Sequence, residues 1–159
     1  MRVTGKPLIA DEVADFLQSG LSINVGTRDD DLQPDGAVAW AARVHDDRAH
    51  LTLFMHKEAA RSMLRNLKVH PEIAIDFDLP TSHRACQVKG CFVSTRPGKA
   101  AERAEVERQL EAFGKDLEAI GIPREMVSGW EIWPCVAIQV RVTELFEQTP
   151  GPGAGEPLR

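Results

Sequence analysis

The segment that most constrains the fold spans residues 73–94, with the sequence IAIDFDLPTSHRACQVKGCFVS. It predicts two β-strands, 73–78 and 85–95, separated by a turn, because proline cannot continue a ladder and serine and threonine favour turns. Gly90 lies inside the second strand. A glycine at such a position indicates a bulge, or a place where a ligand or another backbone comes close.

The second strand also carries polar side chains that suit a ligand. Arg84, Gln87 and Lys89 lie beside the glycine, and bulky donors next to a glycine on a sheet suit a flat anionic ligand with a polar edge. The competing interpretation is a solvated edge strand, because charged side chains at a sheet edge discourage pairing with other chains. Residue types alone favour the edge.

Hydrophobic periodicity predicts six strands and three helices. Apolar and polar residues alternate in the strands, and each helix shows one apolar stripe. The predicted strands are 21–27, 37–44, 49–55, 73–78, 85–95 and 136–146, and the helices are 11–19, 58–68 and 99–120. The tail, 149–159, has too much proline and glycine for regular structure, and is either disordered or laid over a neighbouring surface.

The composition indicates one globular domain. The chain has 159 residues, of which 43% are hydrophobic and 27% charged, and is long enough to bury a core. A net charge of −5 argues against nucleic acid as the main partner. No apolar run reaches the ~20 residues of a membrane span, so we expect no membrane association. We also expect no secretory signal. Three cysteines, an odd number without a C-x-x-C pair, favour free thiols and a cytoplasmic location.

The familiar catalytic motifs are absent from the sequence. It contains no glycine-rich dinucleotide motif, P-loop, nucleophile elbow or H-E-x-x-H pair. There is no tyrosine, and the five histidines are scattered without metal-ligand spacing, so we expect no metal site. If the protein is an enzyme, we expect a bound cofactor to supply the hard chemistry.

The start of the helix 58–68 is a candidate anion site. Unpaired backbone N–H groups and the helix dipole favour a negative charge there. Lys57, Arg61 and Ser62 lie in or beside this first turn. An ordinary solvated helix end explains the same residues equally well.

Two motifs and the order of the elements resemble a known family. Arg84, Gln87, Lys89 and Gly90 form the pattern Arg-x-x-Gln-x-Lys-Gly, and residues 66–71 end a helix with Asn-Leu-x-x-x-Pro. The chain resembles the pyridoxamine 5′-phosphate oxidase-like FMN-binding split barrels over residues 10–148. Residues 148–155 look like the C-terminal signature of a less studied branch of that family.

The resemblance implies a mainly β fold with α-helices. It would be a six-stranded antiparallel split β-barrel with a short N-terminal helix, a short helix between strands 3 and 4, and a long helix before the last strand. The split-barrel domain would span 1–148, followed by the Pro/Gly-rich tail 149–159.

The resemblance also implies a homodimer with an FMN site at the subunit interface. The phosphate would lie near Lys57, Arg61 and Ser62. Arg43, at the end of its strand, would be offered to the flavin. Arg84, Gln87 and Lys89 would reach the phosphate, the ribityl chain or the ring edge. Strand alternation, however, puts Arg84 on the opposite face of the strand from Gln87 and Lys89.

The function implied is an FMN-dependent oxidoreductase that passes a hydride between a reduced nicotinamide and a small acceptor. A true pyridoxamine phosphate oxidase is not expected, because Ser62 and Met63 stand where those enzymes have a basic pair. The alternatives are a flavin-binding or sensing protein without turnover, and a deazaflavin- or haem-binding member of the same fold. A haem would need one of the histidines as an axial ligand.

Overall fold

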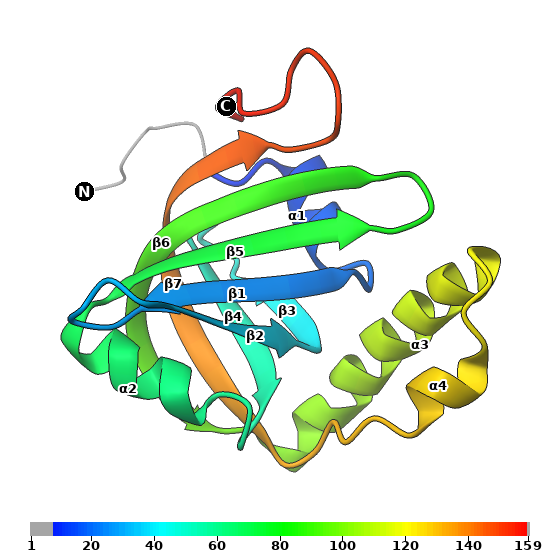
Figure 1. Cartoon of the computed structure of the whole chain (residues 1–159), viewed down its shortest axis with the longest axis horizontal. Helices are drawn as coiled ribbons and strands as arrows, with labels where there is room; N and C mark the ends of the chain where they lie inside the picture. The colour runs from blue at the N-terminus through cyan, green and yellow to red at the C-terminus, as the bar shows by residue number, and fades with distance from the viewer. Residues whose placement is uncertain (1–7, 159) are drawn as a thin grey trace.

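The computed structural model describes residues 8–158 (Figure 1). The first seven residues of the predicted domain 1–148, and the last residue of the predicted tail, lie outside that range. The strands are β1 (Ser22–Arg28), β2 (Pro34–Ala39), β3 (Ala41–Val44), β4 (His50–His56), β5 (Glu72–Leu79), β6 (Arg84–Pro97) and β7 (Cys135–Glu147). The helices are α1 (Asp11–Leu17), α2 (Arg61–Val69), the 3₁₀ turn η1 (Ala100–Glu102), α3 (Arg103–Ala119) and α4 (Arg124–Ser128).

All seven strands form one antiparallel sheet in the order β2-β1-β5-β6-β7-β4-β3. The sheet curls, so that β7 and β4 pass behind β1 and β5 (Figure 1). The two edge strands, β2 and β3, are consecutive in sequence and separated only by Trp40. The chain therefore links the two edges of the sheet, which gives the curled sheet its barrel form.

The structure corrects the expected number of strands from six to seven. The segment 37–44, predicted as one strand, is divided at Trp40: β2 pairs with β1, whereas β3 pairs with β4. At the bend the Trp40 N–H donates to the carbonyl of Phe54 at 2.8 Å. A strand that leaves one edge of a curled sheet for the other has to turn a corner, and local alternation carries no sign of that corner.

The core lies inside the curled sheet, and alternate residues of each strand point into it. Leu51, Leu53 and Met55 of β4 are fully buried, and helices α1 and α2 add further apolar side chains to the same cluster. A second, smaller cluster lies on the outer face of β3, β4 and β7, where the region of η1 and α3 covers the sheet. The long helix therefore packs on the outside of the barrel.

Gly90 marks a bulge, as predicted. The register between β6 and β7 shifts between Lys89 and Gly90. A Cβ atom at Gly90 would lie 2.5 Å from the carbonyl oxygen of Arg141 and 2.7 Å from a methyl carbon of Val140. The backbone of β7 thus approaches too closely for any side chain at this position.

The tail folds back on the end of β7. The N–H of Leu158 donates to the carbonyl of Leu145 at 2.8 Å, and the N–H of Glu147 donates to that of Glu156 at 2.9 Å. The sequence left open whether the tail is disordered or lies over a neighbouring surface. The described part of the tail, up to residue 158, lies over the end of β7.

No helix within residues 8–158 combines the length and the apolar character needed to cross a membrane.

Candidate functional site

The predicted site residues do not converge within one chain. Arg43 lies on β3, and Lys57, Arg61 and Ser62 lie around the start of α2. The guanidinium of Arg84 stacks over the ring of Phe16, 4.1 Å from its centroid. Gln87 and Lys89 share one face of β6, as the alternation predicts, and this is the outer face, because Cys86 and Val88 point into the core.

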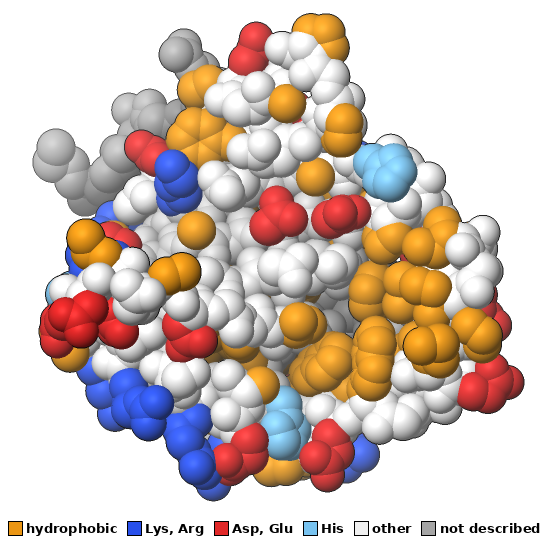
Figure 2. All heavy atoms as spheres, viewed as in Figure 1, with side chains coloured by type: hydrophobic (Ala, Val, Ile, Leu, Met, Phe, Trp, Pro, Cys, Tyr) orange, Lys and Arg blue, Asp and Glu red, His pale blue; other side chains and the backbone are white. Residues whose placement is uncertain are grey.

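A basic cavity of about 280 Å³ borders α2. The space-filling view shows Lys and Arg side chains gathered over this part of the molecule (Figure 2). Arg61 pairs with Glu58 at 2.5 Å, and the helix begins without a side-chain cap. The cations that line this cavity can attract an anion, and the phosphate contact expected of Lys57 and Arg61 stays a prediction. Its lining residues are Lys57, Arg61, Leu64, Arg65, Lys68 and Val136.

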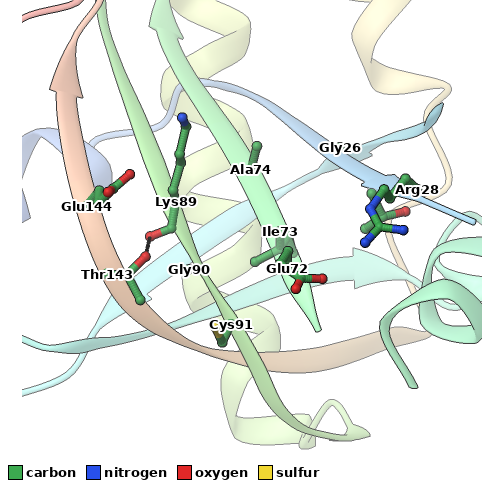
Figure 3. A pocket seen from close by; sticks show the side chains of 11 residues that line it. Gly26, Arg28, Glu72, Ile73, Ala74, Lys89, Gly90, Cys91, Thr143 and Glu144 are labelled. Atoms are coloured by element: carbon green, nitrogen blue, oxygen red, sulfur yellow. Dashed lines mark hydrogen bonds between the residues drawn. The ribbon is translucent and has the colours of Figure 1, made fainter. Parts of the chain in front are cut away.

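A wider hollow of about 460 Å³ lies over β1, β5, β6 and β7 (Figure 3). Lys89 and Arg28 border it from opposite sides, and Glu72 and Glu144 also line it. The ammonium of Lys89 lies 4.9 Å from the ring centroid of Phe146. Because two carboxylates accompany two separated cations, this hollow offers no convergent site for an anion.

The outer face of β3, β4, β7 and β6 carries a third cavity with ordered polar groups. The strand registers place Arg43 opposite Thr52, Thr52 opposite Gln139, and Gln139 opposite Ser94. Four side chains from four neighbouring strands thus form one row across the sheet. The row and two flanking residues line a cavity of about 210 Å³ together with Ala137. We call these six residues the polar strip: Arg43, His45, Thr52, Ser94, Arg96 and Gln139.

Hydrogen bonds orient the neutral members of the polar strip. The Nε2 atom of His45 lies 2.8 Å from the hydroxyl of Thr52. The hydroxyl of Ser94 donates to the amide oxygen of Gln139 at 3.3 Å. Burial lowers the pKa of His45, against the opposing influence of the Asp47 carboxylate. Burial thus favours the uncharged form of the imidazole.

A buried carboxylate holds the two arginines of the polar strip. Glu102 accepts hydrogen bonds from Arg96 at 2.7 and 2.9 Å and from Arg43 at 3.1 Å, and its side chain is only 7% exposed. The Arg96 guanidinium, followed by the backbone N–H of Lys99 and then Arg43, lowers the pKa of Glu102 to about 2. Glu105 binds Arg43 as well. The two guanidiniums are therefore fixed in position, and the two carboxylates balance their charge.

Sequence reasoning identified Arg43 in this strip and missed the other five members. Thr52 and Gln139 fall within predicted strands, and alternation gives the face each one occupies. The pairing register that brings them side by side joins strands far apart in the sequence, and no local pattern reports it.

Within residues 8–158 no group of three or more His, Cys, Asp or Glu side chains is arranged to hold a metal ion.

Comparison with solved structures identifies the fold. An F420 reductase matches with a TM-score of 0.53 at 18% identity, over 82% of this chain and 93% of its own. A putative pyridoxamine 5′-phosphate oxidase from Lactobacillus delbrueckii matches with a TM-score of 0.55 at 14% identity, over 92% and 99%. An FMN-binding protein from Syntrophomonas wolfei matches with a TM-score of 0.50 at 12% identity, over 86% and 84%.

The chain therefore has the split-barrel fold of these proteins, and the resemblance seen in the sequence is confirmed at the level of the fold. No protein-family model and no curated protein matches the sequence.

Proposed function

We propose that the polar strip binds a flavin-type cofactor, either FMN or a deazaflavin. The observation that carries the proposal is the row of polar side chains across four strands, bracketed by two guanidiniums that Glu102 fixes in place. The rim of a flavin ring is flat and presents carbonyl oxygens and ring nitrogens. Arginine and glutamine side chains can donate to such acceptors, and the hydroxyls can donate or accept. Similarity to an F420 reductase and an FMN-binding protein adds support.

We also propose that two chains pair with the cofactor between them. The strip encloses about 210 Å³, whereas pockets for ligands of this kind usually enclose roughly 300–1,000 Å³. A second chain would supply the missing wall. The remaining predicted residues would then reach the phosphate or the ribityl chain from the partner: Lys57, Arg61, Ser62, Arg84, Gln87 and Lys89.

The reaction we propose is oxidoreduction between a reduced nicotinamide and a small acceptor. When bound, the flavin supplies the hydride chemistry. The chain's own residues bind and orient it: Arg43 and Arg96 donate to its rim, and Thr52, Ser94 and Gln139 fix its register along the strip. We place the protein in the cytoplasm, which agrees with the free thiols of Cys86, Cys91 and Cys135.

The test is a titration of the purified protein with FMN, followed by flavin fluorescence and the visible spectrum, with light scattering for the mass. We expect saturable binding to a dimer, and a weaker affinity in Arg43→Ala and Arg96→Ala. Arg124→Ala is the control, because Arg124 pairs with Glu111 and Glu118 outside the strip. An unperturbed flavin spectrum and no saturation would overturn the proposal.

The same preparation separates the alternative functions. NADH or NADPH should bleach the bound flavin if the protein is an oxidoreductase. A flavin that binds and is never reduced by either nucleotide would instead favour a binding or sensing protein. A deazaflavin or a haem bound in place of FMN would be recognised by its own absorption spectrum.

A further inference from the structure

We infer that His45 is the proton-transfer group of the polar strip, and that its imidazole exchanges one proton with the ligand bound there, through the hydroxyl of Thr52. The inference rests on the proposed function and supplies the acid–base group that the sequence did not reveal. The ligand it fits is a planar heterocycle with an ionisable N–H or O–H at its rim.

The position of His45 is fixed by both its backbone and its ring. It directly follows Val44, the last residue of β3, and its N–H donates to the carbonyl of His50 at 2.9 Å, while its carbonyl accepts from Arg48 at 3.0 Å. The ring nitrogen Nε2 contacts the Thr52 hydroxyl at 2.8 Å. Because His45 and Thr52 both line the cavity of the strip, the ring is held where a bound ligand would lie.

Thr52 suits the role of a proton relay. Its side chain rises from β4 into the middle of the row, and the residue is 6% exposed. A hydroxyl can donate one hydrogen bond while it accepts another. In the His45 tautomer that carries its proton on Nδ1, Thr52 Oγ1 could therefore accept a proton from a ligand N–H or O–H while it gives its own proton to His45 Nε2. The ligand then carries one more negative charge, the imidazole one more positive charge, and the hydroxyl is unchanged.

The charges around the ring act in both directions. Burial lowers the pKa of His45, and His50 and Arg43 lower it further, whereas the carboxylates of Asp47 and Asp46 raise it and favour the protonated ring. Arg43 and Arg96 lie in the same cavity, where their guanidiniums can donate hydrogen bonds to the ligand atom that loses its proton. Thr52 and Gln139 are the neutral neighbours on β4 and β7.

His50 provides a matched control within the same turn. Its ring lies 6.1 Å from that of His45, and its Nδ1 pairs with the Asp47 carboxylate at 2.6 Å. It is not among the described residues that line the cavity of the strip. His50 shares the turn with His45 but does not line the cavity. Comparing a substitution of His50 with the same substitution of His45 therefore separates a local effect on folding from a role in proton transfer.

The first experiment titrates the visible spectrum of the protein with saturating FMN across pH, for wild type, His45→Asn and His50→Asn. We expect His45→Asn to move the deprotonation of the bound flavin to a pH about one unit higher or more, because the group that accepts the proton is gone. His50→Asn should keep the wild-type profile. Thr52→Val should resemble His45→Asn, and Thr52→Ser should restore the wild-type profile. A His45→Asn profile equal to that of wild type would overturn the inference.

In the second experiment, the ring resonances of His45 and His50 are titrated by NMR with and without saturating FMN. We expect FMN to shift the titration midpoint of His45 and to leave that of His50 unchanged; an unshifted His45 midpoint would refute the inference while leaving the flavin site in place. If wild type binds no FMN at all, the proposed function itself fails, so the two failures are distinguishable.

Discussion

The side chain of Gln109 pairs with the backbone of Ala42 as if it were one residue of a further strand. Its amide oxygen accepts from the Ala42 N–H at 3.1 Å, and its amide nitrogen donates to the Ala42 carbonyl at 2.8 Å. Both residues are fully buried. Because β3 is an edge strand, this contact gives its otherwise unpaired peptide groups a partner and joins α3 to the barrel.

Replacing Gln109 with leucine should therefore destabilise the fold. Gln109→Leu keeps most of the side-chain volume but leaves a buried N–H and a buried carbonyl unpaired, which we expect to cost about 2–4 kcal/mol. The measurement is the free energy of unfolding in urea. Lys115→Leu, at an exposed position of the same helix, should change it by no more than about 0.5 kcal/mol. Equal effects of the two changes would show that the amide contact contributes nothing.

Stability should fall in acid because of Glu102. Its pKa is about 2 in the folded protein, below the ordinary 4.5, so its ion pairs stabilise the fold fully above about pH 4.5 and are lost as the pH falls towards 2. Glu102→Gln should lower the free energy of unfolding at pH 7 by about 3 kcal/mol and flatten its dependence on acid pH. Glu107→Gln, which breaks an exposed pair with Arg103, should keep the wild-type slope. A Glu102→Gln slope equal to that of wild type would contradict this account.

A methyl group at Gly90 should be poorly tolerated. Gly90→Ala brings a Cβ against the carbonyl oxygen of Arg141, a backbone atom that cannot move aside without disturbing β7. We expect a loss of about 1–3 kcal/mol in the free energy of unfolding. Gly26→Ala is the matched control in β1, because its Cβ would meet nothing closer than an oxygen at 3.9 Å. If both variants are equally stable, the close approach of β6 and β7 is not rigid.

The predicted phosphate contacts are tested by comparing two ligands. If Lys57 and Arg61 bind the phosphate, Lys57→Ala with Arg61→Ala should weaken FMN binding roughly tenfold, about 1.4 kcal/mol, and leave riboflavin binding unchanged. Fluorescence titration measures both affinities. Lys115→Ala with Arg124→Ala removes the same charge from the α3–α4 side and serves as the control. Equal losses for FMN and riboflavin would move the phosphate elsewhere.

The sequence by itself determined the local elements and their faces. The alternation over 136–146 predicts a strand, and the structure has β7 at Cys135–Glu147. The same period predicted that Arg84 would face away from Gln87 and Lys89, and the glycine within the strand predicted the bulge at Gly90. These features depend on neighbours within a few residues, so a single segment contains the information.

Only the tertiary structure decided where the strands meet. The corner at Trp40, the row from Arg43 to Ser94 and the position of Glu102 beneath two arginines all depend on which strands pair and in what register. Register is settled by burying the apolar faces of the whole sheet at once. It is a property of the closed sheet and of no single segment, which is why one member of the polar strip was predictable and five were not.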